Sequence, residues 1–232
     1  MKKPLEIGVL ALQGDFAAHA AALGRVGGCR IREVRRAGEL APLDGLILPG
    51  GESTTLAKLL RDFDLWEPLG DFAGQGKAIF GTCAGLILMA EEVLQPAQAS
   101  LGLLPVSVVR NAYGRQVDSF VVPGRVIIPP DLPSREVLDA ESAGASSETD
   151  SRVEDGRRAS FPAEFVFIRA PRIAETREGV EILAKHDDSP VLVRKGALLG
   201  ASFHPELPGD SGVMRLFLAL VRHVRRTAGV AR

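Results

Sequence analysis

The chain has 232 residues, of which 46% are hydrophobic and 25% charged, and its formal net charge is -1. This length and apolar content suffice for one α/β domain with a full core. Positive and negative side chains are interspersed, so no basic surface indicates nucleic-acid binding. No apolar run approaches the roughly 20 residues that cross a bilayer, and the N-terminal residues lack the apolar segment of a signal peptide. We therefore expect a cytoplasmic protein that binds neither nucleic acid nor membrane.

Cysteine and histidine are sparse in this chain. Only two cysteines, Cys29 and Cys83, and four histidines are present. A disulfide framework is therefore not expected, and a reducing compartment fits. The spacing of these residues does not match a zinc site, so we expect neither a metal nor a cofactor.

The first elements expected are a short apolar strand over Leu5–Leu12 and a helix over Phe16–Val26. The turn between them lacks the Gly-x-Gly-x-x-Gly pattern, which argues against a dinucleotide site. Gln13 follows the strand at the position where open α/β sheets bind ligands, although it can equally be a loop residue that bonds its own backbone. We expect His19, within the helix, to be a surface or packing residue.

A glycine-rich loop follows the strand expected over Leu46–Leu48. Gly50 and Gly51 leave backbone N–H groups bare, so that a ligand can approach them. Ser53 or Thr54 can cap the helix that comes next. Taken alone, this loop is a weak indication of function.

The most informative stretch is Lys77–Met89, in which an apolar strand crosses a Gly-x-Cys-x-Gly turn and becomes an apolar helix, expected to end near Leu94. This is the pattern of a nucleophile elbow with cysteine in place of serine. Gly81 and Gly85 remove side chains that would collide at the turn. Cys83 then lies at a helix N-terminus, where N–H groups favour a thiolate and can hold an oxyanion. The alternative is a small buried hydrophobic residue.

After the elbow, the chain becomes rich in β-formers. Val106–Arg110 and Gln116–Val122 are separated by the turn-like residues 111–115, which predicts antiparallel strands appended to the parallel core. Arg110 can hold a carboxylate bidentately, or it can simply be solvated. Residues 129–162 are small and polar, so we expect a flexible surface insertion in an otherwise single domain over 1–232, with a short helix around Ser134–Ala140.

A last strand over Ala197–Phe203 leads into His204-Pro205-Glu206. Residues two apart in an extended segment point the same way, so His204 and Glu206 can face one site. With Cys83 they form a Cys-His-Glu triad, the arrangement of activated nucleophiles in acyl transfer. These residues predict a cysteine hydrolase without selecting its substrate. The remaining elements expected are strands over Arg30–Val34, Phe165–Pro171, Ile182–His186 and Val191–Lys195, and a helix over Gly212–Thr227.

The chain resembles class I, triad-type glutamine amidotransferases, through Gly81–Gly85 together with Phe203–Glu206. More narrowly, it resembles the glutaminase subunits of pyridoxal 5′-phosphate synthase. The motifs that carry this resemblance are Gly8–Asp15, Leu48–Thr54, Arg110–Gln116 and Phe167–Pro171. They span nearly the whole chain, and only the polar insertion departs from the family's pattern.

The resemblance implies a flavodoxin-like three-layer sandwich: a doubly wound, mostly parallel sheet flanked by helices, with antiparallel strands appended. It also implies the chemistry. Cys83 attacks the side-chain amide of L-glutamine, and His204, oriented by Glu206, moves the protons. The backbone N–H groups of Gly51 and Ala84 stabilise the oxyanion. The products are glutamate and ammonia, formed through a glutamyl thioester.

The resemblance further implies a partner. Ammonia passes to the synthase subunit of a hetero-oligomeric complex, expected to be a large ring, and Gln13 completes the oxyanion arrangement when this partner docks. We expect the oxyanion hole not to be preformed, because the loop at Gly51 is free to reorient its peptide. The residues implied in glutamine binding are Gly51, Glu52, Ser53, Arg110, Ile168 and Arg169.

Two alternatives remain at this point. One is an amidotransferase domain that serves another synthase, against which the Arg110–Arg115 motif argues. The other is a non-catalytic regulatory subunit, which would not need an intact triad.

Overall fold

The structure is a computed structural model that describes residues 3–112, 119–138, 158–209 and 211–230. Its main sheet contains β1 (Leu5–Leu10), β2 (Cys29–Val34), β3 (Gly45–Leu48), β4 (Ala78–Thr82), β10 (Glu181–His186), β11 (Ser189–Lys195) and β12 (Leu198–Ala201). The helices are α1 (Phe16–Val26), α2 (Ser53–Asp62), α3 (Trp66–Gly74), α4 (Ala84–Met89), α5 (Ser134–Val137) and α6 (Gly212–Val230), with a 3₁₀ turn over Ala37–Glu39. None of the helices in the described ranges combines the length and the apolar character needed to span a bilayer.

The strand order is β10-β11-β12-β4-β3-β1-β2. The five strands from β12 to β2 run parallel, while β11 and β10 are antiparallel additions at one edge. This is the doubly wound, mostly parallel sheet that the sequence predicts. The chain order reverses direction at β1, and ligands bind at such switch points in open α/β sheets.

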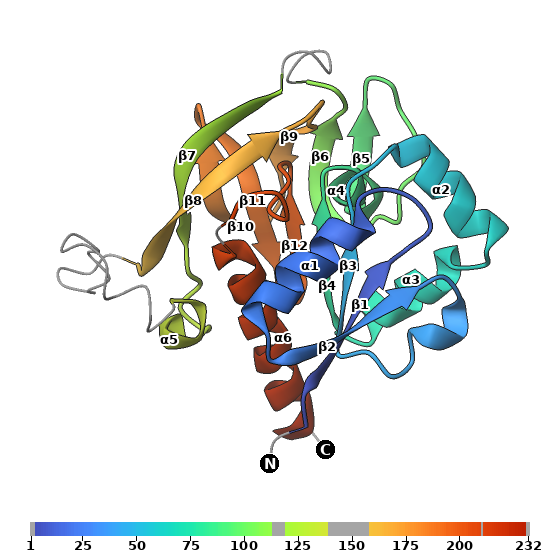
Figure 1. Ribbon diagram of the computed structural model, residues 1–232. Coiled ribbons are helices and arrows are strands. Elements are labelled where there is room, and N and C mark those ends of the chain that lie inside the picture. Colours follow the sequence, from blue (N-terminus) through green and yellow to red (C-terminus); the bar gives the residue numbers. More distant parts are fainter. Residues whose placement is uncertain (1–2, 113–118, 139–157, 210, 231–232) are drawn as a thin grey trace.

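Two apolar clusters lie on the two faces of this sheet. On β3, Ile47 belongs to the cluster that includes Leu23 of α1 and Phe217 of α6. Its neighbours Leu46 and Leu48 belong to the other cluster, with side chains from α2, α3 and α4. Alternation along a strand sends successive side chains to opposite faces, so the molecule has three layers. Figure 1 shows α1 crossing one face, with α2 and α3 beyond the opposite one.

Two smaller sheets are appended to this core. β5 (Ala90–Leu94), β6 (Leu104–Val109) and β9 (Arg172–Thr176) form one, and β7 (Phe120–Ile127) and β8 (Ser160–Phe167) form the other. The expectation that the helix after the elbow runs to about Leu94 is wrong, because the chain from Ala90 onward pairs with β6. Within the described residues β6 pairs with β5 and β9, so it is not the neighbour of β7. The strand expected at 116–122 begins at Phe120, and 113–118 lie outside the described residues.

The described ends of the expected insertion, 129–162, belong to the packed fold. Leu132 and Val137 are buried in the core, and α5 packs on α6. At the other end, β8 already begins at Ser160. The boundaries expected for the insertion were therefore too wide; residues 139–157, and the end of the helix expected to reach Ala140, lie outside the described part of the chain.

The parallel strands carry the candidate site at their carboxyl ends. Gln13 comes shortly after β1, Gly51 after β3, Cys83 after β4 and His204 after β12. Because parallel strands end at the same edge of a sheet, residues far apart in sequence meet there.

Candidate active site

Cys83 lies on a strained turn between β4 and α4, with φ 48° and ψ −103°. A Cβ added at Gly85 would lie 2.0 Å from the carbonyl oxygen of Leu48, and one at Gly81 would lie 2.6 Å from the backbone of Gly85. Both glycines are therefore required for the close approach of strand and helix, as the sequence predicts. A positive φ at a non-glycine residue persists only where the surroundings enforce it, and nucleophile elbows are such places.

His204 and Glu206 follow β12 on the same edge. The Nδ1 atom of His204 lies 2.7 Å from Oε1 of Glu206, and both side chains are almost entirely buried. A Cβ at Gly50 would lie 2.6 Å from Cε1 of His204 and 3.4 Å from Cβ of Cys83. The glycine loop thus packs against the imidazole of His204 and the side chain of Cys83 together.

The charges of this pair are mutually stabilised. Burial alone lowers the pKa of His204, but hydrogen bonds and charge interactions with Cys83 and Glu206 outweigh it and raise the pKa to about 10. Burial acts to raise the pKa of Glu206, but the hydrogen bond between His204 and Glu206, together with the charge interactions with the neighbouring imidazoles, lowers it overall. At neutral pH, a protonated imidazole therefore lies between the sulfur and a carboxylate. Such a group can donate a proton to a leaving amine.

A cavity of about 270 Å³ opens beside Cys83 and His204. It is slightly smaller than the ~300–1,000 Å³ usual for ligand pockets, which suits a small metabolite. All residues implied in glutamine binding line it, namely Gly51, Glu52, Ser53, Arg110, Ile168 and Arg169, and Gln13 lines it too. Ala84 and Glu206 are buried behind this wall.

A carboxylate and a guanidinium face each other in the cavity wall. Arg110 donates to Oε1 of Glu52 at 3.3 Å. Burial raises the pKa of Glu52, but hydrogen bonds from Thr54 and Thr55 lower it to about 2, so this carboxylate remains ionised. Glu52 is also the N-cap of α2, so the expectation that Ser53 or Thr54 caps this helix is wrong. A side chain with two oxygens can accept several N–H groups at once, which a hydroxyl cannot.

Gln13 joins the two loops at the sheet's switch point. Its side-chain oxygen accepts the backbone N–H of Glu52 at 3.0 Å, so it does not serve its own loop alone. Gly51 has φ 155°, and a Cβ there would lie 2.5 Å from the Gln13 oxygen. Likewise, a Cβ at Gly14 would lie 1.9 Å from the carbonyl oxygen of Gly50. The rearrangement of Gly51 on partner docking stays a prediction.

The appended strands supply the far wall of the cavity. β6 ends at Val109 and places Arg110, while β8 ends at Phe167 and places Ile168. The carbonyl oxygen of Ile168 lies 4.0 Å from the Cys83 sulfur. The cavity wall is therefore shared between the main sheet and the appended sheets.

Three residues of this region were missed by sequence reasoning. Ile87 and Asn111 also line the cavity. His19, expected to serve at the surface or in packing, is fully buried with Nε2 3.3 Å from Oε2 of Glu206. Apolar residues at 22 and 23, three and four positions later, indicate that this side of the helix faces inward. Among the described residues, no group of three or more His, Cys, Asp or Glu is placed to hold a metal ion.

Comparison with known proteins agrees with this geometry. The chain is 49% identical over 93% of its length to the pyridoxal 5′-phosphate synthase subunit PdxT of Parafrankia sp., covering 93% of that protein. It is 43% identical over 95% of its length to the PdxT subunit of Niallia circulans, covering all of it. A crystal structure of a glutamine amidotransferase superposes with a TM-score of 0.74 at 42% identity, covering 93% of this chain and 98% of the other.

A more distant structure, PurLQS from Thermotoga maritima, shares the fold at a TM-score of 0.63 and 18% identity, covering 96% of this chain and the whole of that one. The sequence profile of the SNO glutamine amidotransferase family matches residues 9–123 and 144–224. The interruption of this match overlaps the segment in which the sequence departs from the family's pattern. The chain belongs to the SNO glutamine amidotransferase family.

Proposed function

We propose that this protein hydrolyses L-glutamine to L-glutamate and ammonia and delivers the ammonia to the synthase subunit of a pyridoxal 5′-phosphate synthase. The observation that carries the proposal is the arrangement of Cys83, His204 and Glu206 beside a cavity whose wall holds an ion pair. The names of the relatives supply the pathway. The whole chain acts as one glutaminase domain in the cytoplasm.

The ion pair in the cavity wall suits a free amino acid. Arg110 binds the α-carboxylate, because a guanidinium matches a carboxylate bidentately. Glu52 is ionised and accepts the α-ammonium group. In the structure the guanidinium of Arg110 and the carboxylate of Glu52 lie 3.3 Å apart and neutralise each other. An amino acid zwitterion replaces this contact with two of its own.

The triad then performs an acyl transfer in two steps. The Cys83 sulfur attacks the side-chain carbonyl carbon of glutamine, and the N–H groups of Gly51 and Ala84 receive the oxyanion. His204 donates its proton to the amide nitrogen, so that the C–N bond breaks and ammonia leaves. Water then attacks the thioester and gives its proton to His204, the C–S bond breaks, and glutamate is released, which returns the site to its starting state with the proton on His204.

Partner docking controls this cycle in our proposal. Gln13 is bonded to the backbone beside Gly51, so a partner that contacts the β1–α1 turn can act on the oxyanion donor. The complex is a hetero-oligomer, which we propose to be a ring. Transfer within it prevents the loss of ammonia to protonation in solvent.

The test is glutamate release from glutamine by the purified protein, alone and with the synthase subunit, beside a Cys83→Ala control. Low activity that rises with the partner and vanishes in the control is the expected result. High activity without partner would retain the triad and contradict the gating. Absence of activity in both mixtures would favour another synthase or a regulatory subunit.

A second arm tests delivery of the ammonia. The complex with Cys83→Ala is expected to form pyridoxal 5′-phosphate from an added ammonium salt but not from glutamine. If this variant complex still used glutamine, the assignment of Cys83 as nucleophile would be wrong.

A further inference from the structure

A buried histidine outside the triad touches the triad's carboxylate. His19 lies on α1 with no exposed surface. Its Nε2 atom lies 3.0 Å from Oγ1 of Thr82 and 3.3 Å from Oε2 of Glu206. Thr82 directly precedes the nucleophile, and Glu206 orients the catalytic imidazole. The His19 ring thus contacts both the residue before Cys83 and the carboxylate that pairs with His204.

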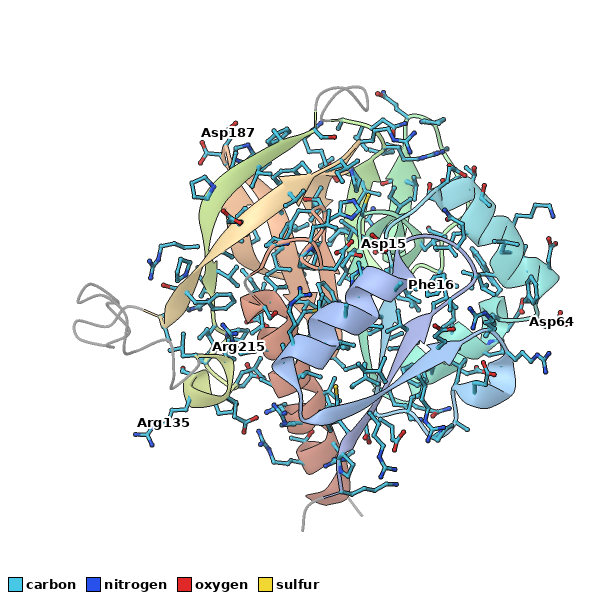
Figure 2. The ribbon with its side chains drawn as sticks, in the orientation of Figure 1. Asp15, Phe16, Asp64, Arg135, Asp187 and Arg215 are labelled. Atoms are coloured by element: carbon cyan, nitrogen blue, oxygen red, sulfur yellow. The ribbon has the colours of Figure 1, made fainter. Side chains whose placement is uncertain are left out.

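The surroundings of His19 determine its protonation. Burial lowers its pKa more than the charge of Glu206 raises it; the other titratable side chains that act on it are His204 and Asp15, at the N-terminal end of α1 (Figure 2). The ring is therefore neutral and carries one proton.

That proton belongs on Nε2. On this nitrogen it can be donated to Oγ1 of Thr82, with Oε2 of Glu206 at 3.3 Å, whereas Nδ1 has no hydrogen-bond partner among the described residues. The opposite tautomer would leave a buried N–H unpaired and turn a lone pair toward a carboxylate. An unpaired buried donor is unfavourable, and a lone pair facing an anion is repelled.

Both oxygens of Glu206 therefore face an imidazole, but only Oε1 accepts a hydrogen bond, and Oε2 has no hydrogen-bond partner among the described residues. Oε1 receives the His204 Nδ1–H at 2.7 Å, and Oε2 faces His19. The same helix also holds the backbone of this segment, since Arg25 donates to the carbonyl oxygens of Glu206 and Pro208 at 3.4 and 3.3 Å. A carboxylate that is hydrogen-bonded at one oxygen and in contact with an imidazole nitrogen at the other is restricted in its plane, which in turn restricts the imidazole that it orients.

From this geometry we infer that His19 is a positioning residue, which holds the Glu206 carboxylate in the plane that orients His204 for proton transfer. The inference rests on the proposed glutaminase function. His19 does not touch the substrate cavity, so it acts on the chemical step and leaves glutamine binding unchanged. The triad of the sequence motif is extended by one member from α1.

The test compares His19→Gln with His19→Met in the complex with the synthase subunit. The two replacements have similar length, but only glutamine keeps an N–H donor near the position of Nε2. We expect His19→Met to lower kcat about tenfold to a hundredfold with KM for glutamine unchanged, and His19→Gln to remain within about threefold of wild type. The loss in His19→Met should stay below the ~10⁴-fold that follows removal of a triad carboxylate.

A double-mutant cycle shows whether His19 acts through Glu206. In a Glu206→Gln background, His19→Met is expected to cost less than about threefold, because the group that it positions has already been altered. A full additional loss in that background would overturn the inference. So would equal losses in the two His19 variants, or wild-type kcat in a folded His19→Met protein.

A proton NMR measurement separates this inference from the proposed function. The buried His204 Nδ1–H bonded to Glu206 should give a low-field resonance that is weakened in His19→Met and kept in His19→Gln. This signal requires no activity, so it tests His19 even if the glutaminase proposal fails. A resonance unchanged in His19→Met would contradict the positioning role.

Discussion

At the scale of single residues, the site depends on a histidine whose proton is held unusually firmly. Cys83 and Glu206 overcome the effect of burial and raise the pKa of His204 to about 10. The same pKa shift stabilises the folded protein, because the folded protein binds this proton more tightly than the unfolded chain does. The contribution is therefore complete below the unfolded pKa of 6.5 and is lost as pH rises toward 10.

The Glu206→Gln variant tests the source of this shift. Ammonia leaves only if His204 is protonated, so we expect kcat/KM of the wild-type protein to fall as pH rises through about 10. Without the carboxylate one of the interactions that raise the pKa is gone, and this alkaline limb should move to lower pH. Steady-state kinetics across the alkaline range measure it. A limb at the same pH in both proteins would show that Glu206 does not hold the proton.

Arg110→Lys tests the recognition of the α-carboxylate. Lysine keeps the charge but cannot form the bidentate pair, so we expect KM for glutamine to rise about tenfold or more while kcat changes less. The exposed Arg172, on β9 outside the cavity, provides a matched control as Arg172→Lys. If both replacements leave KM unchanged, Arg110 does not bind the substrate.

At the scale of secondary-structure elements, the strand–turn–helix at Cys83 depends on close backbone contact. At Gly85 a side chain would meet the Leu48 carbonyl, a backbone atom that cannot turn aside. We expect Gly85→Ala to destabilise the protein by about 2 kcal/mol or more in urea unfolding, since overpacking costs roughly 1–3 kcal/mol and occasionally more, and the atom that a Cβ would meet here belongs to the backbone.

Gly70→Ala is the control for that prediction. Gly70 lies inside α3, with open space where its Cβ would be. Alanine favours a helix over glycine by roughly 1 kcal/mol, so this variant should be neutral or slightly stabilised. Equal losses of stability in the two variants would show that position 85 does not require glycine more than position 70 does.

The sequence predicts elements well where local signals decide them. The bounds of α1 are as expected, because Asp15 caps the helix and alanine, the strongest helix former, fills many of its positions. The end of α4 was misplaced because Leu86–Met89 is apolar throughout and suits a buried helix or strand equally. The chain from Ala90 becomes a strand only through pairing with β6, a contact that local sequence does not contain.

In the candidate site, too, local sequence signals predict some residues, whereas contacts between distant segments determine others. Cys83, His204 and Gln13 come from motifs at the ends of parallel strands, so topology alone brings them together. His19 was missed because a single histidine in a helix has no motif, and its value depends on Glu206, far away in sequence. Packing between α1 and the segment after β12 creates this contact.

At the scale of the whole molecule, an ion pair ties the segment after β7 to the main sheet. Arg194, on β11, is only 5% exposed and forms a bidentate pair with Asp131 at 2.7 and 2.6 Å. This pair lowers the pKa of Asp131, so its contribution to stability is present above the unfolded pKa and is lost as pH falls through the folded one.

Asp131→Asn leaves the Arg194 charge buried without its main partner. Because Asp131 itself is partly exposed, we expect a loss of about 1–2 kcal/mol at neutral pH, less than for a fully buried pair. The difference from wild type should shrink on acidification. Urea unfolding measures both effects, with Asp188→Asn at an exposed position as control. A loss that persists at low pH would show that the carboxylate charge is not the cause.

The division of the cavity wall between sheets has a consequence for how such enzymes diversify. Cys83 and His204, the proposed nucleophile and base, follow strands of the parallel core, whereas Arg110, Ile168 and Arg169 follow strands of the appended sheets. Substitutions in these appended segments can alter which amide enters without disturbing the elbow. A library of variants at positions 110, 111, 168 and 169 would therefore sample new substrate specificities while Cys83 and His204 stay unchanged. In evolution, likewise, the substrate preference can change while the fold is retained.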